Sequence, residues 1–321
     1  MTTSLRVAAF VLVLIAVFAV ALGLGRWVGP LATEPTAHAD DTGHGDGHEA
    51  TEETAPAAAV AGLETSRSGY TLVLTESRLA AGRQHFEFTI TGPDGSPLTA
   101  YDKRHERDLH LIAVRRDLTG FQHVHPTLDP STGTWSTELA VAAGSWRVLA
   151  DFAPEGKDPL VLGTDLLVSG QFAPGPLGED VRVATVGPYQ VVLNGDLAQG
   201  ESRLDLQVSR GGTPVTDLQP YLGAYGHLVA MRAGDLGYLH VHPDGEPGST
   251  PAGPDIAFHT EFPSDGRYRL FLDFRHGGVV RTAAFTVTVG EGGHGHDDHD
   301  HGNDARSDEE SAEGGESGHD H

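Results

Sequence analysis

The chain carries one pattern of histidines twice. His110 is followed, after twelve intervening residues, by His123-Val124-His125-Pro126, and His227 is followed at the same spacing by His240-Val241-His242-Pro243. The residues next to the histidines differ between the two copies, so the histidines are kept while their surroundings change. Because imidazoles are ligands of divalent transition metals, the pattern predicts a three-histidine metal site in each copy.

A histidine pair on a strand can also be structural, bound to a carboxylate or a backbone carbonyl. The third histidine at a fixed offset in both copies favours metal binding over this reading. Asp151 and Asp273 match between the copies and would either orient a ligand ring or pair with Arg147 and Arg269. His105, in a charged loop near His110, is either solvated surface or an extra ligand in one copy.

The repeat extends far beyond the histidines. Gly69 to Gly170 aligns with Gly187 to Gly290, with Trp135 matching Phe258 and Asp151-Phe152 matching Asp273-Phe274. A period this long indicates tandem domains and not a solenoid of short units. Each unit of roughly a hundred residues is long enough to bury a core of its own.

Within a repeat the local pattern is that of strands. Short segments rich in β-branched and aromatic residues alternate with Gly, Pro and Asp, and nothing between them has helical periodicity. The expected strands of the first repeat are 70–74, 85–91, 110–115, 121–125, 134–141, 146–152 and 165–168. This predicts an all-β chain of two tandem immunoglobulin-like or cupredoxin-like antiparallel β-sandwich domains.

The histidines of one copy are expected on a single hairpin. The strand that begins at His110 would turn through Arg116 to Gly120 and return through His123 and His125. Alternation puts His110, Ile112 and Val114 on one face, and His110 would lie opposite His123 or His125. Since these histidines continue an apolar face, we expect a partly buried cluster at one end of the sandwich.

The amino-terminal segment indicates export. Val7 to Gly25 is nineteen residues without a charge, about the length of a membrane-spanning helix. Cleavage as a signal peptide after Ala37-His38-Ala39 is the alternative. Because Arg6 precedes the segment, the positive-inside rule places the rest outside the cytoplasm. The expected organisation is an anchor or signal segment at 1–30, a linker at 31–66, repeats at 67–170 and 187–290 joined by a linker at 171–186, and a tail at 291–321.

Net charge is −24 and is concentrated in the flanks. Residues 33–62 hold seven acids and no base, and residues 291–321 hold eleven acids and one base, so together they carry 17 of the 24 negative charges. Nothing forms a basic stripe, so nucleic acid is not expected as a partner. Both flanks lack large apolar residues, which predicts disorder. The tail adds candidate loose metal ligands at His294, His296, His299 and His301.

The ligand set narrows the choice of metal. The chain has no cysteine and only two methionines, which excludes thiolate zinc sites, the blue-copper cysteine ligand and a methionine-rich Cu(I) carrier. Imidazole coordination suits Cu(II), Zn(II) and Ni(II), and the Irving–Williams order puts copper first. We therefore expect Cu(II), with Zn(II) second.

A resemblance points the same way. Asp108-Leu109-His110-Leu111-Ile112, the His123-Val124-His125-Pro126 run, Trp135 and the segment Gly144 to Phe152 resemble exported bacterial proteins near the YtkA-like and FixH-like domains. The fold these imply is similar to that of the CopC copper carriers, although the methionine-rich loop and mature amino-terminal histidine of CopC are missing. The resemblance implies immunoglobulin-like sandwiches in copper handling, with a copper transporter or oxidase assembly factor as partner.

Two other classes of function stay open. A three-histidine metal with an open fourth position can activate water, but no Asp or Glu is placed beside His-x-His as a general base, so an enzyme is not expected. The second alternative is an envelope scaffold or adhesion module with structural histidines. The expected function is an exported, membrane-anchored protein that binds divalent metals for buffering, delivery or resistance.

Overall fold

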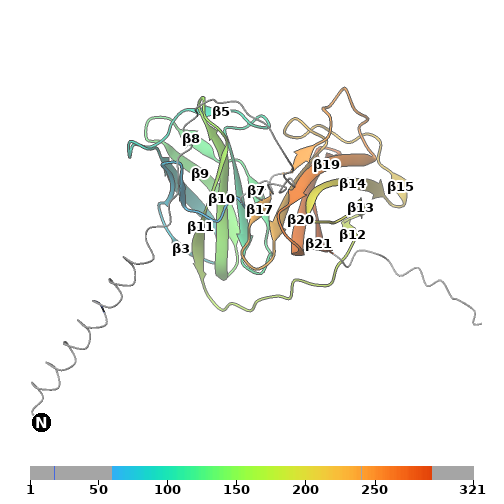
Figure 1. The fold of residues 1–321 in the computed structure, drawn as a ribbon, viewed down its shortest axis with the longest axis horizontal. Coiled ribbons are helices and arrows are strands. Elements are labelled where there is room, and N and C mark those ends of the chain that lie inside the picture. Colours follow the sequence, from blue (N-terminus) through green and yellow to red (C-terminus); the bar gives the residue numbers. More distant parts are fainter. Residues whose placement is uncertain (1–17, 19–59, 240, 291–321) are drawn as a thin grey trace, which may run out of the picture. The chain divides into compact units, whose positions relative to one another are not determined.

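The structure is a computed structural model that describes residue 18 and residues 60–239 and 241–290. The two repeats form two domain regions built of strands (Figure 1). Apart from Phe18, the expected anchor lies outside the described residues, and so do His240 and the tail histidines. Within the part of the chain that is described, no helix is both long and apolar enough to cross a membrane.

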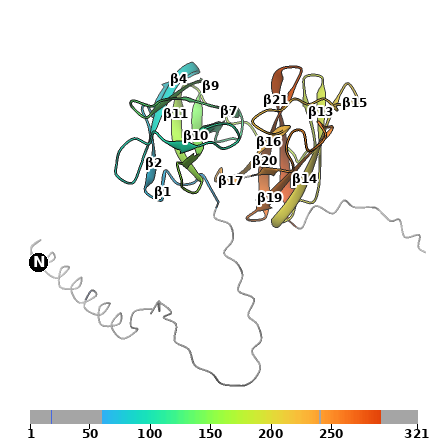
Figure 2. The same cartoon turned by 90° about the horizontal axis from the view of Figure 1, so that it is seen from above.

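The first repeat folds into two facing sheets. One has the order β1-β2-β4-β9-β8, and the other has the order β3-β11-β10-β6-β7 with β5 paired to β10 (Figure 2). The strands are β1 Ser66–Arg67, β2 Tyr70–Leu74, β3 Arg78–Ala80, β4 Gly82–Thr91, β5 Tyr101–Asp102, β6 Leu109–Arg115, β7 Gln122–Val124, β8 Thr127–Asp129, β9 Thr134–Val141, β10 Gly144–Pro154 and β11 Leu160–Ser169. Every segment predicted as a strand in the first repeat overlaps one of these strands.

The second repeat has the same plan. Its sheets have the orders β12-β13-β14-β19-β18, with β15 paired to β14, and β17-β16-β20-β21. The strands are β12 Val183–Val186, β13 Tyr189–Asn194, β14 Gly200–Arg210, β15 Thr213–Pro214, β16 Gly226–Arg232, β17 Tyr238–Leu239, β18 His242–Pro243, β19 Asp255–Phe262, β20 Gly266–His276 and β21 Val279–Val289. Among the described residues no sheet combines named strands of both repeats.

The all-β, two-repeat prediction is confirmed, with three corrections of detail. The sandwich was expected to be antiparallel throughout, but the short β3 runs parallel to β11. Strand β12 lies inside the segment predicted as a linker, where it pairs with β13. Residues before 67 also take part in the fold, because the carbonyls of Gly62 and Leu63 accept hydrogen bonds from the Arg147 guanidinium at 2.7 and 2.8 Å.

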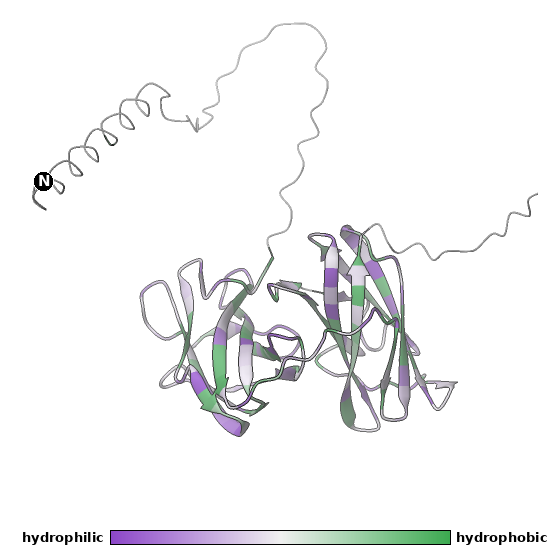
Figure 3. Ribbon diagram, turned by 90° about the horizontal axis from the view of Figure 1, so that it is seen from below, coloured by the Kyte–Doolittle hydropathy of each residue, from purple (hydrophilic) through white to green (hydrophobic). Residues whose placement is uncertain are grey.

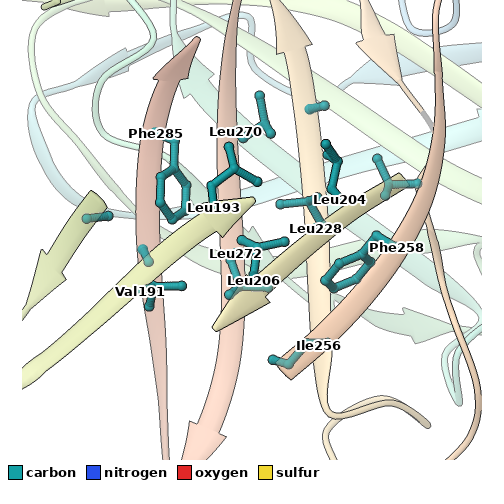
Figure 4. Close-up of a cluster of buried hydrophobic side chains, with 14 of the residues drawn as sticks. Val191, Leu193, Leu204, Leu206, Leu228, Ile256, Phe258, Leu270, Leu272 and Phe285 are labelled. Atoms are coloured by element: carbon teal, nitrogen blue, oxygen red, sulfur yellow. The ribbon is translucent and has the colours of Figure 1, made fainter. Parts of the chain in front are cut away.

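Each sandwich buries the inward-facing residues of its strands. Hydrophilic and hydrophobic residues alternate along several strands (Figure 3), as expected for strands with one face in the core. In the second repeat, Leu204 and Leu206 of β14 pack with Phe258 of β19 and Leu270 of β20 (Figure 4). In the first repeat, Trp135 stacks on Phe88 at 6.4 Å between ring centroids.

Strands β6 and β16 are buried on both faces. Leu109 and Leu111 belong to the core of the first sandwich, whereas Ile112 and Val114 belong to another cluster that includes Val229, Met231 and Phe271 of the second repeat. The apolar face that carries His110 is therefore separate from the core of its own sandwich. Both residue sets of the strand are apolar, as in sheets covered on both sides, and the histidine face packs against the other repeat.

Candidate metal centre

The β6–β7 hairpin positions the histidines of the first copy. Ile112 pairs with His123 in the antiparallel register, so the side chains of His110, His123 and His125 share a face. The turn requires Gly120, whose φ is 67°. A Cβ there would lie 2.6 Å from the Trp146 ring. The hairpin expected from the sequence is confirmed.

Three ring nitrogens converge on this face. His110 Nδ1 lies 3.0 Å from His123 Nε2 and 3.1 Å from His125 Nε2, and one nitrogen from each ring lies within 4.8 Å of the others. A tetrahedral ion with metal–nitrogen bonds of 2.0–2.1 Å separates its ligand nitrogens by about 3.3 Å. The three rings could therefore hold one metal ion with small adjustments.

The outer nitrogens fix the tautomers of two of these rings. His110 Nε2 lies 3.0 Å from the carbonyl oxygen of Arg104, and His123 Nδ1 lies 3.0 Å from Oδ2 of Asp273. A carbonyl and a carboxylate only accept hydrogen bonds, so both outer nitrogens carry hydrogen. In neutral rings the inner nitrogens then present lone pairs toward one another, as in metal sites whose outer partners orient the ligands.

Burial keeps the rings of His110 and His125 neutral at physiological pH. Loss of hydration lowers the pKa of His110 to about 4, with a further contribution from the neighbouring His123. The same two causes, together with His110, lower the pKa of His125 to about 2. Two lone pairs about 3 Å apart repel each other unless a cation lies between them. Because protonation is disfavoured, a metal ion is the cation that this arrangement fits.

The second copy is described only in part. His227 is buried on β16, with Nε2 3.1 Å from the Leu222 carbonyl oxygen, and desolvation with the nearby His105 and His123 lowers its pKa to about 3. His240 lies outside the described residues. His242 is exposed and pairs with His259 across β18 and β19. Both rings line a cavity of about 740 Å³.

The two matched aspartates connect the repeats. Asp273 orients a ligand ring, but the ring is His123 of the other repeat. In return, Asp151 accepts a hydrogen bond from the Tyr238 hydroxyl of the second repeat at 3.1 Å. The alternative pairing of these aspartates with Arg147 and Arg269 is wrong, although Asp151 forms an ion pair with Arg104 at 3.5 Å. Arg147 binds Asp165 and two backbone carbonyls, and Arg269 donates to the Thr286 hydroxyl.

The sequence reasoning missed that residues of the second repeat reach the first copy. The His227 ring centroid lies 6.3 Å from that of His110 and 6.2 Å from that of His123, and His105 lies 5.1 Å from His227. The available signal was the second apolar face of each strand, formed by Ile112 with Val114 and by Val229 with Met231. That pattern predicts a partner on the histidine face.

Comparison with solved structures adds no functional argument. Surface layer protein SbsC, domains 4–9, is 15% identical over 68% of this chain and 31% of that chain, with a TM-score of 0.21. A marsupial T cell receptor is 11% identical over 68% of this chain and 99% of the receptor chain, with a TM-score of 0.22. The chain thus spans about a third of the SbsC fragment.

The family comparison is more informative. No curated protein matches the chain. One family model, described as "Domain of unknown function (DUF8832)", matches twice, at residues 64–162 and 184–291. The two matches cover most of the chain and coincide with the two repeats. The chain therefore belongs to the DUF8832 family and contains two copies of its domain.

Proposed function

We propose that this chain is an exported, membrane-anchored protein that binds divalent metal ions for buffering, delivery or resistance. The observation that supports the proposal best is the convergence of His110, His123 and His125, whose nitrogens lie within 4.8 Å of one another. The outer hydrogen bonds from His110 and His123 aim their lone pairs inward. Such a site binds metal without having to order the chain first.

Copper(II) is proposed as the first metal and zinc(II) as the second. Neutral imidazole suits both ions, and copper has the higher intrinsic affinity at nitrogen sites. A copper transporter or an oxidase assembly factor would then be the partner that receives or supplies the ion. The sandwiches are proposed to be of the immunoglobulin-like or cupredoxin-like kind, as the resemblance to copper carriers implies.

The core and the tail should bind metal differently. Deletion of 291–321 removes His294, His296, His299, His301 and many carboxylates, so it should abolish weak binding of several ions and leave the tight site. Calorimetric titration with Cu(II) and with Zn(II), on the full chain and on the shortened one, measures both classes. Loss of all binding on tail deletion would show that the core histidines are structural and would reject the proposal.

The proposed location can be tested separately. With the amino-terminal segment in the membrane and both repeats outside the cytoplasm, protease added to spheroplasts should digest the repeats. A cytoplasmic marker protein should stay intact in the same sample. Digestion of the repeats only after lysis would reverse the proposed topology.

Two other functions are ranked below metal binding. For an envelope scaffold, the tail-deleted protein would purify without bound metal and would not take it up. For a three-histidine hydrolase, the metal-loaded protein would turn over an ester or a phosphoester substrate. We propose a non-enzymatic role, because within residues 60–239 and 241–290 the carboxylate that hydrogen-bonds one of the three rings is that of Asp273, which accepts from His123 Nδ1 on the outer side of the ring.

A further inference from the structure

The second repeat contributes to the centre of the first repeat through neighbouring strands. His227 on β16 and Asp273 on β20 are direct cross-strand partners. The carboxylate of Asp273 binds Nδ1 of His123 at 3.0 Å, and both side chains are nearly fully buried there. This contact brings the His227 ring close to the rings of His123 and His110.

The His227 ring lies near the outer limit of the distances at which it could share an ion with the other rings. With metal–nitrogen bonds of 2.0–2.1 Å, the centroids of two imidazoles on the same ion lie about 5.2 Å apart at a tetrahedral angle and about 6.4 Å apart when the rings are trans. The centroid of His227 lies 6.2 Å from that of His123 and 6.3 Å from that of His110. One ring cannot be trans to both His110 and His123, and the nitrogens that already converge come from the other three rings. The His227 ring must therefore move about 1 Å closer to them to share the ion.

The tautomer of His227 suits this role. Its Nε2 lies 3.1 Å from the carbonyl oxygen of Leu222. Since a carbonyl only accepts, Nε2 carries the hydrogen and Nδ1 keeps its lone pair in the neutral ring. The same arrangement, a backbone carbonyl on the outer nitrogen, orients His110 at the matched position of the first repeat. His227 therefore has one nitrogen ready for a metal.

We propose that His227 supplies a fourth imidazole to the centre formed by His110, His123 and His125, so that the two repeats build one shared metal site. This inference rests on the proposed metal binding and goes beyond it, because the sequence pattern predicts one independent site in each repeat. A four-imidazole site is coordinatively closed, which favours tight holding of the ion over hydrolysis. The bound ion would also join the two repeats.

The test uses the full chain in detergent, titrated with Cu(II) against free histidine as a competing chelator that masks weak sites. Variants are His123→Ala, His227→Ala, His227→Asn, His105→Ala and the exposed control His85→Ala. His227→Asn keeps a donor for the Leu222 carbonyl oxygen, and thermal unfolding without metal checks the fold of each variant. Electron paramagnetic resonance of the copper complex reports the coordinating nitrogens.

The proposal expects His227→Ala and His227→Asn to raise the Kd of the same tightly bound ion whose binding His123→Ala weakens. The increase should exceed about tenfold, the lower end for loss of an outer-shell partner, and the nitrogen hyperfine pattern should change. It is overturned if these variants leave the affinity and spectrum of that ion unchanged, or if His105→Ala alone produces the effect. If the wild type takes up no competitor-resistant copper, the proposed function fails as well.

Discussion

Replacement of His123 by alanine is expected to raise the Kd of the tight metal ion by a few hundredfold. Zinc sites of four ligands have apparent binding free energies of about 10–16 kcal/mol, or about 2.5–4 kcal/mol for each ligand. His123 is the ring whose two nitrogens contact both His110 and Asp273, so its loss removes a ligand and breaks a contact between the repeats.

The measurement is a competition titration with Cu(II) on the chain lacking 291–321. His85→Ala is the matched control, because His85 is an exposed histidine of the same repeat whose ring hydrogen-bonds Glu87 and Glu138. It should leave the Kd unchanged. Equal behaviour of His123→Ala and the unsubstituted chain would mean that the converging rings are structural.

Much of the first site follows from local rules. The spacing of His110, His123 and His125 together with strand alternation predicts a hairpin with all three side chains on one face, and the register of β6 and β7 has this form. Turn residues such as Gly120 and the short apolar segments likewise indicate where strands begin and end. These features depend on residues near one another in the sequence, which is why they can be predicted from it.

The contacts between the repeats could not be predicted in the same way. Phe121 stacks on Phe271 with ring centroids 3.9 Å apart, although the two residues are 150 positions apart. No periodicity encodes such a pairing. A strand with two apolar faces, such as β6, shows only that something covers the second face. That the cover is β16 and β20, and that Asp273 thereby reaches His123, follows from tertiary packing.

The matched aromatic residues Phe121, next to β7, and Tyr238, on β17, make different contacts with the other repeat. Phe121 packs against the second repeat by stacking, whereas its counterpart Tyr238 donates a hydrogen bond to Asp151. Tyr238 is buried, and desolvation with the charge of Asp151 raises the pKa of its hydroxyl well above its usual value. The hydroxyl therefore stays a donor, which satisfies a buried carboxylate and favours the docked arrangement.

Acid should destabilise the metal-free protein through the same histidines. The pKa of His110 is about 4 in the folded chain and 6.5 for an unperturbed imidazole. Below pH 6.5 the unfolded state therefore binds more protons than the folded state, and the free energy of unfolding decreases as the pH is lowered. Between pH 7.5 and pH 4.5, His110 alone should remove about 2–3 kcal/mol, at about 1.4 kcal/mol for each pH unit in this window. The pKa of His125 and His227 is lowered too, so they act in the same direction.

Urea unfolding of the chelator-treated protein at the two pH values measures this change. His110→Gln should flatten the dependence. His85→Ala should not, because hydrogen bonds to Glu87 and Glu138 raise the pKa of His85 and its contribution has the opposite sign, present at low pH and lost as pH rises. Protons also compete with metal for the same nitrogens. Copper should therefore be released over the same pH range in which the metal-free protein loses stability. A metal-free protein equally stable at pH 7.5 and pH 4.5 would mean that the rings are hydrated and that the site is not preorganised.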